Sequence, residues 1–167
     1  MKKICFIAPS GYGKSTAIKI LEKKYKIQNI KIAEPMYKMQ EYFYSCIKTK
    51  IKGEQDGELL QFLGQKIRKE NPTFLLDEFS QKLKNADQQT IITNDDCRPP
   101  DYEYLSKLGF VFVGINGFRH DRLDHSPINQ KASIEWQNEI KCDYYVSNTS
   151  SLNDYEIQIL DLMEKIL

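Results

Sequence analysis

Residues 3–16 read KICFIAPSGYGKST, and this stretch decides the fold of the chain. Its first part, residues 4–7, is a run of apolar residues, two of them β-branched and one aromatic, which favours a buried strand. Gly11 and Gly13 then permit a tight turn, and a helical pattern opens at Lys14. A strand, a glycine turn and a helix in this order are typical of a phosphate-binding loop (P-loop), usually written G-x-x-x-x-G-K-[ST].

The pattern departs from that form at one place, because Ala8 stands where the first glycine is expected. Glycines later in the loop still let backbone N–H groups turn inward around a phosphate, and the following helix directs its positive end at the same anion. Lys14 supplies charge for the β- and γ-phosphates, and the Ser15 hydroxyl is placed for Mg²⁺. The alternative is a glycine-rich turn that binds no ligand. The predicted ATP-binding residues are Ser10, Gly11, Tyr12, Gly13, Lys14, Ser15 and Thr16.

The size and charge of the chain narrow its class. Its 167 residues suit one domain with a sizeable core, and 24 basic against 23 acidic residues leave a net charge of +1. This balance shows no bias toward nucleic acid or an anionic membrane, so an anion site must be local. No apolar run is long enough for a membrane span or a signal-peptide core. The scattered cysteines predict free thiols in a reducing cytoplasm rather than disulfides or a zinc site: Cys5, Cys46, Cys97 and Cys142.

Strand and helix patterns alternate along the rest of the chain. This alternation predicts a three-layer α/β domain, with a parallel sheet covered by helices on both faces. We expect strands at residues 4–7, 30–33, 90–93, 110–115 and 144–146. We expect helices at residues 15–25, 34–46, 58–69, 72–84, 101–107 and 132–140, and a last helix from Ser151 onward. The apolar stripe of that last helix is expected to contain Ile157, Leu160 and Ile166. Residues 1–167 are interpreted as a single domain, in which about 34–86 form a helical substrate-binding insertion and about 116–133 a short lid.

Two adjacent acids, Asp95 and Asp96, follow the expected strand at 90–93. A P-loop fold needs an acid at the end of a neighbouring strand to hold Mg²⁺ or its water shell. Open α/β sheets bind ligands at the carboxyl ends of their strands, where this pair lies. From the residues alone either acid could serve, and the alternative is a polar turn, which Asp and Asn favour.

Arginines follow the expected strand at 110–115. Arg119 and Arg122 are three residues apart, so on a helical turn both could face one site. Guanidinium groups offset the charge of a phosphoryl group in transfer. The alternative is a solvated charged loop. His120 and His125 do not make a metal site by this pattern, because there are only two and no cysteine accompanies them.

Gln61 and Arg68 are seven residues apart and therefore share one face of the expected helix at 58–69. An arginine for an anionic group and a glutamine that both donates and accepts would suit a nucleoside monophosphate. Aromatic residues nearby could stack on a base or belong to the core: Tyr37, Tyr42, Tyr44 and Phe62.

Taken together, these motifs resemble the phage-type deoxynucleoside monophosphate kinases of the P-loop nucleotide-kinase superfamily, over nearly the whole chain. APSGYGKST resembles the phosphate loop of that family, and LLQFLGQKIRKENP is similar to its L-L-Q-x-x-G-x-x-x-R segment. DDCRPPDYEYLSKLG resembles its D-x-R-x-P element. Ile32 to Pro35 with Lys38 resembles the entry to its monophosphate-binding region, and residues 142–152 resemble its closing segment.

The resemblance implies roles for individual residues. It places Asp96, rather than Asp95, at the active site and with Ser15 at the metal. It puts Lys38, Gln61, Arg68, Asp96 and Arg98 in acceptor binding, and Lys14, Arg98, Arg119 and Arg122 in catalysis. The chain departs from the family at Pro99, where an aromatic residue usually stands, and residues 119–133 are hard to align.

The activity that the resemblance implies is transfer of the γ-phosphoryl group of ATP, with Mg²⁺, to a deoxynucleoside 5′-monophosphate, a step of nucleotide biosynthesis. One alternative is a P-loop kinase acting on a modified pyrimidine in DNA or on another small metabolite. DNA would require a basic groove, which the near-neutral charge does not favour. The other alternative is a non-catalytic nucleotide-binding protein. We expect neither a membrane nor a nucleic-acid partner, and a homodimer is possible.

Overall fold

The computed structural model describes residues 1–51, 53, 55–117 and 139–167. These residues cluster into two compact units. The first, which we call the sheet unit, comprises Met1–Asn29 and Ala86–Leu167, and the second, the helical unit, is Ile30–Asn85. The interpretation of residues 1–167 as a single domain with a helical insertion stays a prediction.

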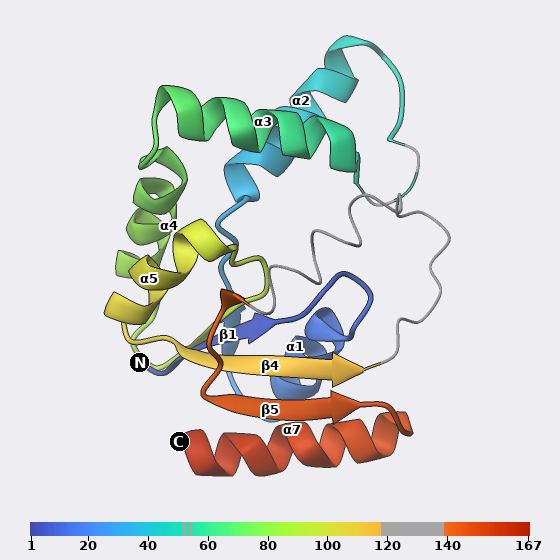
Figure 1. Cartoon of the computed structure of the whole chain (residues 1–167), viewed down its shortest axis with the longest axis vertical. Coiled ribbons are helices and arrows are strands. Elements are labelled where there is room, and N and C mark those ends of the chain that lie inside the picture. The colour runs from blue at the N-terminus through green and yellow to red at the C-terminus, as the bar shows by residue number, and fades with distance from the viewer. Residues whose placement is uncertain (52, 54, 118–138) are drawn as a thin grey trace. The chain divides into compact units, whose positions relative to one another are not determined.

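The sheet unit contains a five-stranded parallel sheet in the order β2-β3-β1-β4-β5. This confirms the predicted parallel α/β architecture. Its strands are β1 (Lys3–Ile7), β2 (Ile27–Asn29), β3 (Ile91–Asn94), β4 (Val111–Gly117) and β5 (Tyr144–Asn148), and its helices are α1 (Lys14–Glu22), α5 (Pro99–Lys107) and α7 (Leu152–Ile166). Three of the strands, β1, β4 and β5, are labelled in Figure 1.

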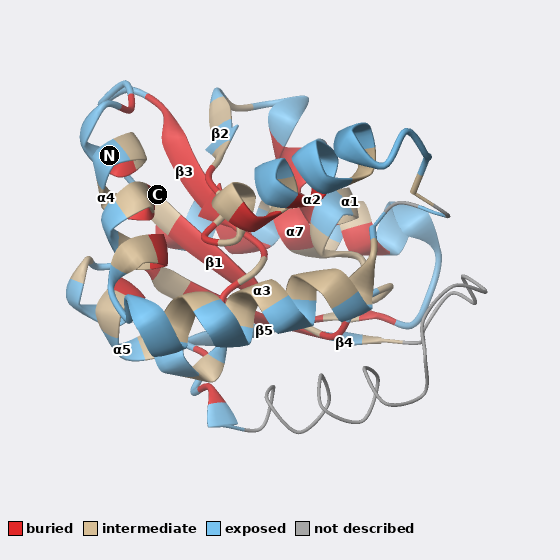
Figure 2. Cartoon of the chain, turned by 90° about the horizontal axis from the view of Figure 1, so that it is seen from above, coloured by how far each residue is buried: buried red, intermediate tan, exposed pale blue. Residues whose placement is uncertain are grey.

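Helices cover both faces of this sheet. On one face, Ile4 and Phe6 of β1 are buried in a cluster with side chains of α1 and α7. The intervening Cys5 points to the other face, since side chains alternate along a strand. On a neighbouring strand, Tyr102 of α5 packs against Phe112 of β4, with ring centroids 4.7 Å apart. Figure 2 shows the buried strands β1 and β3 at the centre of the unit.

The carboxyl ends of β1 and β3 are neighbours, as the sequence predicted. Cys5 of β1 pairs with Asn94, the last residue of β3. The P-loop that follows β1 and the two acids that follow β3 therefore leave the sheet at the same edge. This is the edge at which open α/β sheets bind ligands.

The second strand was predicted at the wrong place. It was expected at residues 30–33, whereas β2 is Ile27–Asn29. Periodicity favoured the later window, because Ile30, Lys31 and Ile32 alternate apolar and polar, whereas β2 reads Ile-Gln-Asn. Pairing with β3 sets the actual position, because Ile27 lies in register with Ile91 and the Ile91 N–H donates to the Lys26 carbonyl at 2.9 Å.

The apolar stripe of the last helix also differs from the expected one. Ile157 is 51% exposed, so its predicted place on the stripe is wrong. Leu160 is only partly buried, while Ile166 is buried as predicted. The buried side of α7 is set by contact with α1 and the sheet, and it consists of Tyr155, Ile159, Leu162, Met163 and Ile166.

Two helices begin two residues away from their expected starts. α5 starts at Pro99 rather than Asp101, since proline is tolerated in a first helical turn. α4 starts at Phe74 rather than at Pro72, and Asn71 is the C-cap of the preceding helix. Asn71 has an extended backbone, which is the usual conformation before a proline.

The helical unit consists of α2 (Glu34–Cys46), α3 (Gly57–Glu70) and α4 (Phe74–Lys84). A hydrogen-bond network around Asp56 sets the start of α3. The Asp56 carboxylate accepts from the Leu59 N–H at 3.0 Å and from the Tyr44 hydroxyl at 2.7 Å, and the Asp56 N–H donates to the buried Gln40 at 2.8 Å. The Leu59 and Tyr44 hydrogen bonds hold the pKa of Asp56 below its usual value.

An ion-pair cluster joins α2 to α4 within the helical unit. Glu34 contacts Lys82 of α4, and it also pairs with Lys38 at 3.1 Å. The hydrogen bond from Lys82 is the main cause that lowers the pKa of Glu34 from its ordinary value of 4.5. Glu34 therefore stabilises the fold above that ordinary value, and its contribution is lost as the pH falls through the lowered pKa.

This cluster predicts a pH-dependent effect of Lys82→Met. At pH 7 the variant is expected to unfold at a lower urea concentration than the wild type, because Glu34 loses its main partner. The difference should shrink at an acidic pH below the lowered pKa of Glu34, where protonation removes the charge that Lys82 pairs with. Urea unfolding at the two pH values measures it. A difference that is equal at both pH values would show that the Lys82 charge does not act through Glu34.

The cysteines are free thiols, as predicted. Cys5, Cys97 and Cys142 are buried, and burial raises the pKa of the Cys142 thiol to about 11. Among the helices in the described part of the chain, none has the length and apolar character that crossing a membrane requires.

Candidate phosphate-binding site

The loop between β1 and α1 has the glycine conformations that a P-loop requires. Gly11 has φ +85° and Gly13 has φ +100°, both in the left-handed region. A residue with a side chain rarely adopts these angles, so glycine is needed at both positions. Gly13 is also the N-cap of α1, so the loop passes directly into the helix.

Ala8 does not disturb this geometry. Among the described residues only Lys48 has a positive φ without being a glycine, so Ala8 has an ordinary backbone conformation. Its methyl group packs against the core cluster of the sheet unit. The departure from the usual first glycine therefore costs the loop no strain.

The start of α1 differs from the starts of other helices in the chain. α3 and α7 begin with side chains, Asp56 and Ser151, that accept from first-turn N–H groups. The N-cap of α1 is Gly13, which has no side chain, and the first turn of α1 contains no acidic residue. The positive end of this helix is therefore not neutralised by a carboxylate of its own first turn, which favours an external anion there.

Lys14 spans the loop. Its ammonium group donates to the carbonyl of Ala8 at 2.6 Å and to that of Pro9 at 3.0 Å. A lysine ammonium is a compact charge on a flexible stem, so it can exchange carbonyl oxygens for phosphate oxygens with a small movement. Ser15 follows it and is exposed, as a hydroxyl that reaches a metal ion must be.

Two residues that the sequence analysis did not assign to the site also contact the loop. Asn148, at the end of β5, donates through Nδ2 to the Tyr12 carbonyl at 3.1 Å. Tyr155 of α7 donates from its hydroxyl to the Gly13 carbonyl at 3.2 Å. Both lie more than 130 positions from the loop, and the family resemblance of the closing segment was the one signal that pointed to Asn148.

The structure separates the two acids after β3. Asp95 is buried and accepts from Nδ2 of Asn29, on β2, at 3.2 Å. Asp96 is half-buried and accepts at 2.7 Å from Nδ2 of Asn94. Asn94 in turn accepts from the thiol of Cys5, on β1, at 3.3 Å.

These contacts link the two acids to different neighbours of β3. β2 and β1 flank β3 on opposite sides in the strand order. Asp95 is bound toward β2, whereas the partner of Asp96 is bound toward β1, the strand that leads into the P-loop. The Asn94 side chain further accepts from the N–H groups of Asp96 at 3.3 Å and Cys97 at 3.0 Å, which fixes this turn.

Arg98 is exposed at the start of α5 and has an extended backbone. Its N–H donates to the carboxylate of Asp101 at 3.2 Å, while the Asp101 N–H donates to the Arg98 carbonyl at 2.8 Å. Asp101 is buried, so this reciprocal pair anchors the backbone of Arg98 at the start of α5. Arg98 thus leaves the same edge of the sheet as Asp96, two residues later in the chain.

The predicted acceptor residues lie in the helical unit. Gln61 is exposed and Arg68 is half-buried on α3, a helix in which no residue is buried. Lys38 is held by Glu34 at 3.1 Å. The structure therefore brings Gln61 and Arg68 onto one helix, as predicted, and gives Lys38 a carboxylate partner that the sequence analysis did not foresee.

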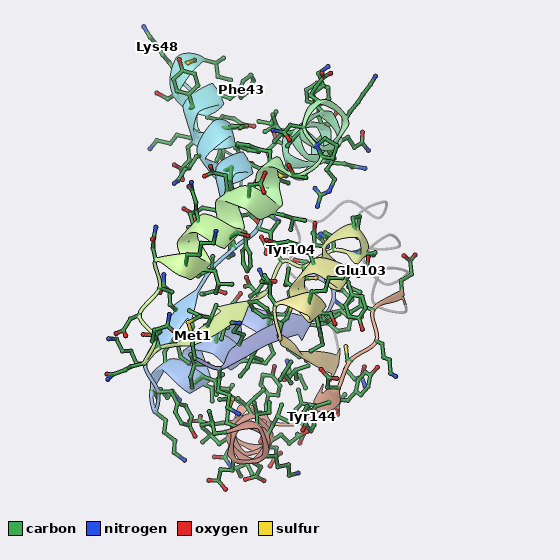
Figure 3. The ribbon with its side chains drawn as sticks, turned by 90° about the vertical axis from the view of Figure 1, so that its left-hand side faces the viewer. Met1, Phe43, Lys48, Glu103, Tyr104 and Tyr144 are labelled. Carbon is green, nitrogen blue, oxygen red and sulfur yellow. The ribbon has the colours of Figure 1, made fainter. Side chains whose placement is uncertain are left out.

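The four aromatic residues that the sequence analysis considered for base stacking do not belong to the buried core. Tyr42 is 74% and Phe62 62% exposed. Tyr44 donates to Asp56, and the Lys31 ammonium lies 5.6 Å from the centroid of the Tyr37 ring. Figure 3 shows their neighbour Phe43 near the C-terminal end of α2, at the surface.

Several predictions fall on residues 118–138, which lie outside the described residues. They concern Arg119 and Arg122, with His120 and His125, and most of the expected lid and the helix at 132–140. The first two residues of the expected lid, Asn116 and Gly117, are instead the end of β4.

Comparison with known proteins gives matches by structure alone. No protein-family model matches the chain, and no curated protein matches it. A shikimate kinase from Bacteroides thetaiotaomicron is similar with a TM-score of 0.55 and 14% identity, covering 98% of each chain. A shikimate kinase from Acinetobacter baumannii, solved with shikimate, has a TM-score of 0.55 and 15% identity, covering 99% of this chain and 94% of that chain.

A gluconokinase from Sinorhizobium meliloti is also similar, with a TM-score of 0.50 and 14% identity, covering 98% of this chain and 92% of that one. These similarities extend over whole chains, and at such low identity they concern the fold. With the parallel sheet, its strand order and the glycine loop after β1, they show that this chain has the P-loop kinase fold.

Proposed function

We propose that this protein transfers the γ-phosphoryl group of ATP to a deoxynucleoside 5′-monophosphate. The observation that carries the proposal is the pairing of a P-loop after β1 with Asp96, whose partner Asn94 is bound to β1 itself. A phosphate-binding loop beside a strand-end carboxylate is the minimum that Mg²⁺-dependent phosphoryl transfer requires.

The residues present fit both ATP and Mg²⁺. Backbone N–H groups at the start of α1 and the Lys14 ammonium would bind the phosphates, where no first-turn acid opposes an anion. Ser15 and Asp96 would hold Mg²⁺, which neutralises phosphate charge when bound. No residue needs to form a covalent intermediate, because positioning and charge stabilisation account for most of the catalysis of such transfers.

The proposed acceptor rests on the resemblance to deoxynucleoside monophosphate kinases, and α3 is compatible with it. Arg68 would bind the acceptor phosphate, since a guanidinium matches phosphate geometry. Gln61, seven residues earlier, is exposed and can both donate to and accept from a base edge. Arg98, Arg119 and Arg122 would offset the charge that develops during transfer.

A coupled ADP-release assay tests the acceptor class. The panel would contain all deoxy- and ribonucleoside monophosphates, a DNA oligonucleotide, shikimate and gluconate, the last two because structurally similar kinases are named for them. We expect deoxynucleoside monophosphates to stimulate release most. Stimulation by the oligonucleotide, shikimate or gluconate alone would contradict the proposed acceptor. No ADP release with any compound of the panel would contradict kinase activity.

Arg68→Ala is expected to raise the KM for the monophosphate acceptor by about 10-fold or more, because a charge-assisted hydrogen bond is lost. The KM for ATP should stay unchanged. Lys69→Ala is the matched control, since it removes one positive charge from an exposed neighbouring position on α3. Equal effects of the two variants would show that only the net charge of α3 matters, and would remove Arg68 from the proposed acceptor site.

A further inference from the structure

We propose that Asn148 and Tyr155 are positioning residues of the P-loop. Their side chains hold two consecutive carbonyl groups of the loop, and the N–H groups of the same two peptide units are thereby aimed at phosphate. The inference deepens the proposed function and rests on it in one respect, that the anion bound there belongs to a nucleotide.

The contacts are specific to the turn that precedes α1. Asn148 holds the carbonyl of Tyr12, and Tyr155 holds that of Gly13, at 3.1 and 3.2 Å. The Gly13 carbonyl also accepts the first intrahelical hydrogen bond of α1, from the Ala17 N–H at 2.9 Å. Both carbonyls are therefore bound on the side of β5 and α7.

Fixing the direction of a carbonyl group also fixes the direction of the N–H group in the same peptide unit. A trans peptide is planar, and its C=O and N–H groups point in opposite directions. No described peptide bond is cis. Holding the Tyr12 carbonyl therefore directs the Gly13 N–H away from β5 and α7, and holding the Gly13 carbonyl does the same for the Lys14 N–H. These two N–H groups are among the donors that a P-loop presents to phosphate.

The turn needs such anchors because glycine is the most flexible residue. Gly13 at φ +100° could populate many other backbone conformations, and each would rotate its peptide units away from the anion. Close packing adds to the hydrogen bonds. A Cβ atom built on Gly13 would lie only 2.6 Å from Nδ2 of Asn148, so the amide sits directly against the backbone of the loop.

Both anchors are themselves held firmly. Asn148 is 9% exposed, and a Cβ atom on Gly117 of β4 would lie 2.9 Å from its carbonyl oxygen. Tyr155 is 1% exposed within the core cluster of the sheet unit. Burial also raises the pKa of the Tyr155 phenol, so its hydroxyl keeps the proton that it donates.

The test measures binding of inorganic tripolyphosphate, with Mg²⁺, by titration calorimetry. The variants are Asn148→Leu, which keeps a similar shape without a donor, and Tyr155→Phe, which removes one oxygen atom. We expect each to weaken tripolyphosphate binding by about threefold to tenfold, the scale of one net hydrogen bond. In the kinase assay the KM for ATP should rise by a similar factor, with the acceptor KM unchanged.

Matched controls are Asn153→Leu, an exposed position on α7, and Tyr144→Phe, on β5. They should bind tripolyphosphate like the wild type. If Asn148→Leu does not fold, Tyr155→Phe decides alone. Wild-type affinity in the folded variants, equal losses in the controls, or a wild-type protein that does not bind tripolyphosphate would each overturn the inference. A wild-type protein that binds tripolyphosphate but phosphorylates no acceptor would instead overturn the proposed function.

Discussion

Replacing Lys14 by alanine is expected to lower turnover by at least about 100-fold, the scale of removing one preorganised electrostatic stabiliser. Lys14 contributes the positive charge of the loop, and its contacts with the carbonyls of Ala8 and Pro9 hold that charge against the loop. The loss should be largest in turnover, because charge on the transferring group grows in the transition state. Steady-state ADP release at saturating ATP and acceptor measures it.

Lys19→Ala is the matched control for this prediction. Lys19 is an exposed lysine in the last turn of the same helix, so the variant makes the same change in charge away from the loop. Its turnover should stay close to that of the wild type. Near-wild-type turnover of Lys14→Ala would refute the assignment of the loop as the catalytic phosphate site.

Asp96→Asn is expected to lower turnover by about 100-fold or more and to raise the Mg²⁺ concentration needed for half-maximal activity. The substitution keeps the shape of the side chain and removes the negative charge that a hard cation prefers. It also replaces the charged acceptor of the Asn94 Nδ2 hydrogen bond by a neutral one, so this hydrogen bond should stabilise the turn less. Turnover as a function of Mg²⁺ concentration separates loss of the metal from loss of stability.

Asp95→Asn provides the comparison within the same turn. Asp95 is buried and bound to Asn29 on the β2 side, so its substitution should lower the melting temperature more than it changes the Mg²⁺ requirement. If Asp95→Asn raises the Mg²⁺ requirement and Asp96→Asn does not, the metal belongs to Asp95 and the assignment from the resemblance is wrong.

Much of the fold was predictable because it depends on local patterns. The strands at β1, β3, β4 and β5 are apolar runs bounded by turn residues, and Ser151, where the last helix was expected to begin, is the N-cap of α7. At residues 27–33 the local alternation favoured the wrong window, because residues 30–32 alternate apolar and polar whereas residues 27–29 do not. The position of β2 is set by its pairing with β3, which is remote in sequence.

The candidate site likewise has residues that local spacing identifies and residues that only tertiary contacts reveal. The loop, Lys14 and Ser15 were identified from spacing alone, because a P-loop is contiguous in sequence. The two acids were found together, but their separate orientations depend on Asn29 and Asn94, which polar composition does not single out. No sequence motif singles out Tyr155, and only its hydroxyl contact with Gly13 connects it to the loop.

By itself, the sequence determined the phosphate-binding loop and the parallel α/β class, since both are properties of short contiguous segments and of their order along the chain. The tertiary structure decided which residues form the strand after α1 and which side of α7 is buried. It also decided which acid is linked to β1 through Asn94, and which side chains bind the carbonyl groups of the loop. These depend on contacts between residues far apart in the chain, and the energy of such contacts is not encoded in any local pattern.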